Sequence, residues 1–164
     1  MNNDEQEPME SRRTPYDELY PTCERADAAL RIYTGDLDPQ EVTKRLAIKP
    51  DSVQTKGEVR GNSIGRTRIV QINGWFLSSE GKVLSKDLRH HLDWLLGIVY
   101  PGREALLGLQ RTRGVRMDVN CVWWSAHGHG GPTLWPEQMH LLSDLGLECS
   151  FDVYFFGEDW QEVK

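Results

Sequence analysis

The residues best suited to ligand binding or catalysis lie between Trp123 and Leu134, where the chain reads Trp-Trp-Ser-Ala-His-Gly-His-Gly-Gly-Pro-Thr-Leu. Two histidines two positions apart point the same way in an extended segment, a spacing that suits proton transfer or a shared metal ion. Glycine amides ahead of a predicted helix can cradle an anion, helped by the helix dipole. The candidate ligand-binding residues are therefore Trp124, Ser125, His127, His129, Gly130, Gly131 and Thr133.

Several kinds of chemistry are not supported by this segment. It lacks the Gly-Lys-Ser/Thr of a nucleotide-binding loop, and Ser125 does not lie in a Gly-x-Ser-x-Gly turn. No third ligand follows at a recognised metal spacing, so we expect neither a metal nor a cofactor. The favoured alternative is a tight connection from strand to helix, in which the glycines supply positive φ and Pro132 fixes the exit. The sequence assigns no catalytic residue, and it favours a protein that is not an enzyme.

Aromatic residues on the predicted strands form a second group. By strict alternation, Tyr33, Trp124, Tyr154 and Phe156 fall on the sheet face opposite the apolar core. An exposed aromatic patch marks a partner or ligand surface, unless another segment covers it, such as the C-terminal residues around Trp160. Tyr33, Tyr154 and Phe156 are therefore candidate partner-contact residues.

The segment 49–68 is rich in glycine and basic residues. Its three glycines, five basic side chains and weak periodicity predict a long exposed loop. Long loops in compact domains are either functional or flexible. Residues 44–116 hold 14 basic and six acidic side chains, although the whole chain carries a net charge of −6. The segment is thus a candidate contact surface, with nucleic acid the least favoured partner because phosphates require clustered basic residues.

Strands and helices alternate along the rest of the chain. Period-two patterns predict four strands, at 28–33, 68–78, 115–124 and 147–156. Start and stop signals predict three helices, at 39–47, 85–99 and 136–145. The order β-α-β-α-β-α-β with half-polar strands favours an α+β fold. We expect a four-stranded mixed sheet with about three helices packed on one face, of ferredoxin-like character rather than doubly wound.

Length and composition indicate one globular domain. The chain has 164 residues, of which 38% are apolar, 25 acidic and 19 basic. We predict a disordered N-terminal tail over 1–22, a single domain over 23–157 and an acidic C-terminal tail over 158–164. Without a long apolar run or a signal-peptide pattern, we expect a cytoplasmic protein that does not bind membranes. The three cysteines are expected to be reduced thiols.

Six short stretches carry a resemblance to a known family. They are Leu30-Arg-Ile-Tyr, Asp36-Leu-Asp-Pro, Lys56-Gly57, Gly74-Trp-Phe-Leu-Ser-Ser, His91-Leu-Asp-Trp-Leu-Leu and Trp124-Ser-Ala-His-Gly-His-Gly-Gly-Pro-Thr-Leu. In this order they resemble the bacterial family catalogued as domain of unknown function 4279, over residues 26–157. The resemblance implies a bacterial, cytoplasmic protein and brings no activity, cofactor or catalytic residue. One departure is Trp135, since similar proteins tend to have a small polar helix cap there.

Two functions remain open at this stage. A small acidic domain with an aromatic patch and no catalytic constellation predicts a non-catalytic protein-binding module, of the immunity or accessory type. The alternative is a small-molecule or anion-binding protein, with its site at 125–133. If the first and third strands were parallel, Asp36 and Asp38 would lie at that same end of the sheet and could contribute carboxylates. The sequence leaves the partner, the strand order and the oligomeric state open.

Overall fold

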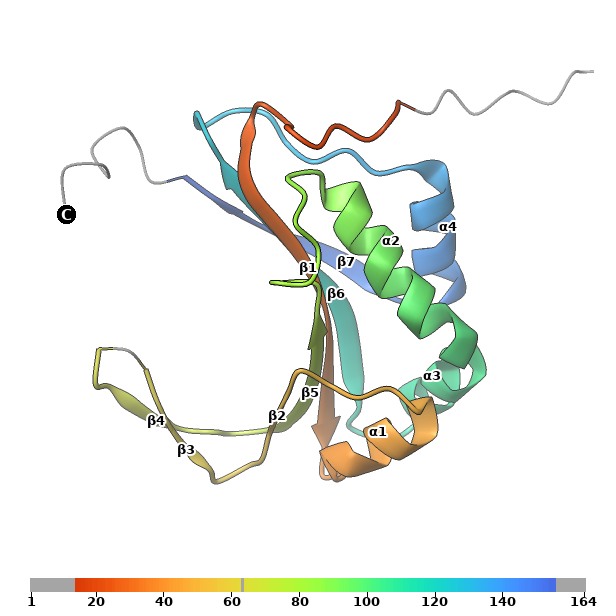
Figure 1. Ribbon diagram of the computed structural model, residues 1–164. Coiled ribbons are helices and arrows are strands. Elements are labelled where there is room, and N and C mark those ends of the chain that lie inside the picture. Colours follow the sequence, from red (N-terminus) through yellow and green to blue (C-terminus); the bar gives the residue numbers. More distant parts are fainter. Residues whose placement is uncertain (1–13, 63, 156–164) are drawn as a thin grey trace, which may run out of the picture.

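A five-stranded sheet forms the centre of the protein, with helices on one side of it (Figure 1). The computed structural model describes residues 14–62 and 64–155. The strands follow the order β2-β5-β1-β6-β7. Their bounds are β1 Cys23–Gly35, β2 Ser52–Gln54, β5 Asn73–Ser78, β6 Arg116–Ser125 and β7 Glu148–Tyr154. The central strand β1 is antiparallel to both β5 and β6, whereas β6 and β7 are parallel.

The α+β class is confirmed, but the details of the sheet differ from the prediction. The sheet has five strands instead of four, and the ferredoxin-like order is not confirmed. The additional strand, β2, is only three residues long and pairs with β5. A strand this short inside a glycine-rich segment has too few alternating positions to give a periodic signal.

The segment 49–68 is not the loop that its composition predicts. Besides β2 it contains β3 (Val59–Gly61) and nearly all of β4 (Thr67–Ile69), which pair with each other in an antiparallel hairpin. The backbone of Val70 closes the base of this hairpin through hydrogen bonds of 2.8 Å to Gly57 and to Glu58. Figure 1 shows the hairpin projecting on the side away from the helices. We refer to β3 and β4 as the arm.

The helices begin where their capping residues place them. Their bounds are α1 Pro39–Leu46, α2 Leu88–Val99, α3 Arg103–Gln110 and α4 Pro136–Asp144, with a 3-10 turn at Tyr100–Gly102. Asp38 caps α1 by accepting a 2.8 Å hydrogen bond from the amide of Gln40. Asp87 caps α2 by accepting a 3.0 Å hydrogen bond from the amide of Arg89. Before α4, Gln138 reaches back to the amide of Trp135 at 3.0 Å.

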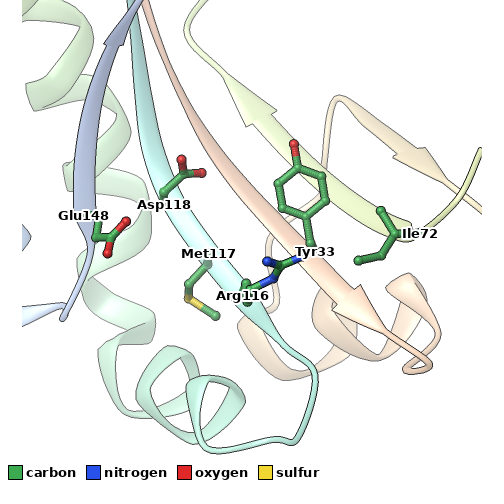
Figure 2. Close-up of a pocket in the computed structure, with 6 residues that line it drawn as sticks. All are labelled: Tyr33, Ile72, Arg116, Met117, Asp118 and Glu148. Atoms are coloured by element: carbon green, nitrogen blue, oxygen red, sulfur yellow. The ribbon is translucent and has the colours of Figure 1, made fainter.

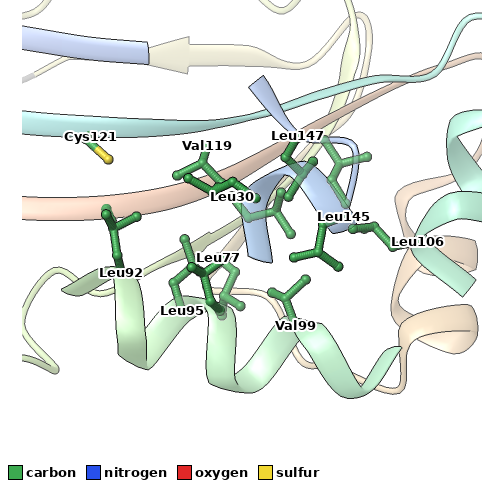
Figure 3. Packing of buried hydrophobic residues seen from close by; sticks show 14 of the residues in the cluster. Leu30, Leu77, Leu92, Leu95, Val99, Leu106, Val119, Cys121, Leu145 and Leu147 are labelled. Atoms are coloured by element: carbon green, nitrogen blue, oxygen red, sulfur yellow. The ribbon is translucent and has the colours of Figure 1, made fainter. Parts of the chain in front are cut away.

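The apolar core lies between the helices and one face of the sheet (Figure 3). Leucines of α2 at helical spacing, among them Leu92 and Leu95, pack against Leu30 of β1 and Val119 of β6. All four side chains are 1% exposed or less. The core therefore occupies one face of the sheet and leaves the other face without a helical cover in the described part of the chain.

The segment before β1 crosses the N-terminal end of α2. Residues 14–22, which belong to the predicted disordered N-terminal tail 1–22, make specific contacts with this end of α2. We refer to residues 14–22 as the strap. The carbonyl of Thr14 accepts hydrogen bonds from Arg89 (3.0 Å) and from the indole of Trp135 (2.9 Å). The amide of Asp17 donates to Asp87 at 2.8 Å. The other predicted tail residues, and Phe156, lie outside the described residues.

Candidate functional site

The glycine-rich segment 125–133 folds back on itself and on the strap. The Ser125 hydroxyl donates to the carbonyl of His129 at 3.0 Å. The Tyr20 hydroxyl donates to the carbonyl of Gly131 at 2.8 Å and lies 3.0 Å from the Thr133 hydroxyl. Gly130 has a φ of +89°, and a Cβ there would lie 2.6 Å from the Thr22 hydroxyl. The backbone conformation and the close packing against the strap both require glycine at this position.

His127 and His129 are exposed, and their rings stack with centroids 6.0 Å apart. Among the described residues no group of three or more His, Cys, Asp or Glu side chains is placed to hold a metal. A small cavity of about 100 Å³ lies beside His129, Ser125 and Gly130, with Trp123 and Phe155 also in its lining. Of the seven ligand-binding candidates, only those three line the cavity.

The start of α1 lies far from this segment. Because β1 and β6 are antiparallel, the end of β1 that leads into α1 meets the beginning of β6. The glycine-rich segment follows the other end of β6. The condition under which Asp36 and Asp38 could supply carboxylates to 125–133, parallel first and third strands, is therefore not met, and Asp38 instead caps α1.

The face of the sheet away from the helices, which we refer to as the open face, carries polar and aromatic side chains in cross-strand rows. Tyr33 lies opposite Arg116, and at the other end of the sheet Arg25 lies opposite Trp124. Tyr33 packs edge-on against Phe76, with ring centroids 5.7 Å apart. Trp124 packs against Tyr154 at 5.4 Å. The aromatic residues thus form two pairs at opposite ends of the open face instead of one patch.

A cleft lies between the open face and the arm. It consists of two adjoining cavities of about 300 and 440 Å³, which share Tyr33 and Ile72 in their lining. Figure 2 shows the first cavity, bounded by Tyr33, Ile72, Arg116, Met117, Asp118 and Glu148. The second cavity reaches the arm at Arg60 and Arg68 and the sheet at Ser52, Gln54 and Phe76. Of the residues singled out in the sequence, only Tyr33 and the basic side chains of the arm lie here.

Charges in and around the cleft are partly compensated. Arg31 and Asp118, opposite each other on β1 and β6, form an ion pair with Nε and Oδ1 2.9 Å apart, and this hydrogen bond raises the pKa of Arg31. Nε of Arg60 donates to Glu58 at 3.2 Å. Neither Arg68 nor Arg116 makes an ion pair within the described residues. The cleft therefore has positive groups available for a ligand.

The cleft presents groups that can bind a ligand, together with the carboxylates of Asp118 and Glu148. Guanidinium, amide and hydroxyl donors line the cleft together with two aromatic rings. Cysteine thiols are possible nucleophiles, but the described ones lie elsewhere. Burial raises the pKa of Cys23 to about 11. Contact with Cys149, whose Sγ lies 3.7 Å away, and burial both raise the pKa of Cys121. The thiols of Cys23 and Cys121 therefore stay protonated at neutral pH, whereas the same contact lowers the pKa of Cys149.

The comparison with known families matches almost all of the folded chain. The family model described as Domain of unknown function (DUF4279) matches residues 22–156. The chain belongs to this family. The match confirms the resemblance seen in the sequence, and it spans β1 to β7, including the arm and the glycine-rich segment. Neither the curated proteins nor the solved structures contain a match to this DUF4279 domain. Within the described residues, no helix has the length and apolar character needed to cross a membrane.

Proposed function

We propose that this DUF4279 domain is a non-catalytic protein-binding module that holds a segment of its partner in the cleft between the open face and the arm. The observation that carries this proposal is the sheet with helices on one face only, overhung on its other face by a hairpin. A sheet face that no helix covers, with a hairpin projecting beside it, forms a concave surface that is suited to bind a ligand or a partner.

The arm supports the proposal because it buries little of its own apolar surface. Val59 and Ile69 form a cross-strand pair, and they are 64% and 59% exposed. Ile64, in the turn, is 72% exposed. A two-stranded hairpin with exposed apolar residues gains little stability from its own contacts. Val59 and Ile69 alternate with Arg60 and Arg68 and so lie on the opposite face of the hairpin. A partner that extends from the cleft onto that face would bury these side chains and stabilise the arm.

The floor of the cleft supplies an anchor point. The rings of Tyr33 and Phe76 pack against each other, and Ile72 lies beside them. Aromatic side chains surrounded by polar groups are typical of the residues that dominate binding energy in interfaces. The immunity or accessory type of role, in a bacterial cytoplasm, belongs to the same proposal. The free cysteines of the described chain are compatible with a reducing compartment.

Selection from a random-peptide display library against the purified protein tests this function. The peptides, selected on the wild-type protein alone, are then measured against a Tyr33→Ala, Phe76→Ala double variant, which removes the aromatic floor. We expect selected peptides to bind the wild-type protein with a measurable Kd in calorimetry and to bind the double variant at least tenfold more weakly. Met139→Ala, on the exposed side of α4, is the matched control and should bind normally. Peptides that bind the double variant as well as the wild type would contradict the proposal.

A second candidate function rests on the cavity beside the glycine-rich segment. The Trp123 indole lines this cavity, is 1% exposed, and its Nε1 has no hydrogen-bond partner in the described structure. A buried donor without a partner is uncommon and fits a small bound acceptor, such as water or an anion. A thermal-shift screen with small anions tests it. A ligand at a hundredfold excess over its Kd would add about 2.7 kcal/mol of stability. That gain should disappear in His129→Ala, and no shift with any anion would remove this candidate.

A further inference from the structure

The cleft contains an unusual pairing of like charges. Arg60 and Arg68 lie directly opposite each other on β3 and β4. Side chains in this register leave the same face of the hairpin, with their Cβ atoms roughly 4.5–5.5 Å apart. Like charges in this position destabilise a hairpin unless something compensates them. Within residues 14–62 and 64–155 just one of the two is compensated, since Glu58 pairs with Arg60.

The two arginines differ in how firmly they are held. Arg60 donates through Nη2 to the carbonyl of Val53 in β2 and through Nε to Glu58 at 3.2 Å. These bonds fix its guanidinium against the edge of the sheet, on the side of the arm that faces the cleft. The side chain of Arg68 is exposed and makes no hydrogen bond or ion pair with any described residue. One guanidinium is thus preorganised and the other is free to close on a ligand.

Both side chains line the 440 Å³ cavity. Ser52 and Gln71 add a hydroxyl and an amide to the lining of the same cavity, which also includes Phe76 of the sheet. Glu148 and Asp118 line the other cavity together with Arg116, and Asp118 is paired with Arg31. At the arm, Glu58 is paired with Arg60, whereas Arg68 has no carboxylate partner among the described residues. A ligand with one negatively charged end would therefore bind in the cleft with that end at the arm.

We propose that Arg60 and Arg68 form an oxyanion subsite that takes a carboxylate or phosphate group of the partner. This inference rests on the proposed function, because the subsite belongs to the same cleft. Guanidinium groups match both oxyanions with paired N–H donors, and such charge-assisted bonds are stronger than neutral ones. An oxyanion between the two arginines also removes the repulsion across the hairpin. The whole chain has a net charge of −6, so long-range attraction does not bring the anion to this site.

Titration with inorganic phosphate, and separately with acetate, tests the subsite without knowledge of the partner. Backbone amide resonances are followed by NMR, with sodium chloride holding the ionic strength constant. We expect saturable shifts confined to β2 and the arm. Arg68→Ala should weaken binding at least tenfold. Arg66→Ala is the matched control, since it removes the same charge from the turn of the arm, outside the cavity lining, and should bind as the wild type does.

Equal weakening by Arg66→Ala and Arg68→Ala would overturn the inference, because it would reduce the effect to general charge. Arg68→Lys, which keeps the charge but loses the paired donors, should bind more weakly than the wild type.

Peptides selected by display separate this inference from the proposed function. Cleft-dependent peptides that bind Arg68→Ala unchanged would overturn the subsite and leave the function standing. If phosphate binding depends on Arg68 but no peptide binds in the cleft, the proposed function would be overturned and the oxyanion subsite would stand. Aspartate-containing peptides and their phosphoserine counterparts, compared by affinity, identify the preferred oxyanion.

Discussion

The two faces of the sheet differ sharply, although the same strands build both. On β1, Leu30 and Ile32 point toward the helices and are completely buried, while Arg31 and Tyr33 lie on the open face and are partly exposed. The helix side is held by apolar packing. The open face is held by polar contacts such as the pair between Arg31 and Asp118. The contrast indicates that one face supplies most of the stability, so the other is free to carry binding groups.

The largest effect is expected from a polar residue on the helix side. Asp87 is completely buried, caps α2 and pairs with Arg89, itself 2% exposed. Asp87→Ala leaves a buried guanidinium without its partner, a change that costs about 3–5 kcal/mol. Chemical denaturation measures it. The exposed cap Asp38 is the control, since Asp38→Ala should cost only about 1 kcal/mol. Equal costs would show that burial of the Asp87 pair adds nothing.

The free energy of unfolding should also depend on pH through the protonation of Asp87. Burial opposes its ionisation, but hydrogen bonds from Arg89 and from the amide of Asp17 prevail and hold its pKa below the ordinary value of 3.8. The unfolded state therefore takes up the proton first. The stabilisation by this carboxylate is present above pH 3.8 and is lost as the pH falls through the folded-state pKa.

Truncation in the apolar layer is expected to have the next largest effect. Leu30 is completely buried between α2 and the sheet, so Leu30→Ala should destabilise the fold by about 2–5 kcal/mol through lost burial and the cavity left behind. Urea unfolding measures the change. The neighbouring open-face variant Tyr33→Ala should cost clearly less, because Tyr33 is only partly buried. A larger cost for Tyr33→Ala would contradict the division of roles between the faces.

A buried histidine makes the helix side sensitive to acid. Burial lowers the pKa of His91 below 6.5, although the carbonyl of Ser85, 2.8 Å from its Nε2, acts in the opposite direction. Below pH 6.5 the unfolded state binds a proton that the folded state does not, so stability falls as the pH drops from 6.5 to the lower folded-state pKa. The slope is at most about 1.4 kcal/mol per pH unit. His91→Gln should flatten the plot of unfolding free energy against pH in this range, and an unchanged slope would refute the assignment.

The smallest effect is expected on the open face. A double-mutant cycle on Arg31 and Asp118 should give a coupling of about 0–1 kcal/mol, because the pair is partly exposed to water. Thermal unfolding of the four proteins at low and high salt measures it. Salt should reduce the coupling further. A coupling of several kcal/mol would mean that the open face contributes to stability as the helix side does.

Local patterns in the sequence predicted the parts of the fold that depend on neighbouring residues. The Asp38-Pro39 start of α1 and the Pro136 start of α4 follow from capping chemistry, and alternation from Val115 to Trp124 gave β6. The strands β2 and β3 were missed, and β4 was merged with β5 in the predicted strand 68–78, because β2, β3 and β4 have only three residues each, with partners that no periodicity reveals. The direction of β1 relative to β6 depends on tertiary packing, so the sequence left open whether Asp36 and Asp38 lie near 125–133, and the antiparallel pairing places them at the other end of the sheet.

In the candidate site, too, local sequence predicted some features, whereas others depended on tertiary structure. Positive φ at Gly128 and Gly130 was predicted because only glycine adopts it readily. Tyr33 and the basic arm were singled out separately, but nothing local indicated that they share a cleft. The missed signal was the alternation that places Arg31 and Asp118 on the same face as Tyr33. This signal becomes useful only once the register between β1 and β6 is known.

The position of β1 at the centre of the sheet has a consequence for the time course of folding. It is synthesised before the other strands of the described residues, yet the pair formed by Arg31 and Asp118 joins residues 87 positions apart. At translation rates of roughly 5–20 residues per second, β1 waits several seconds for β6 to emerge. Pairings over such long stretches of chain also slow refolding. During synthesis the apolar side of β1 is therefore exposed to chaperones before its own sheet can cover it.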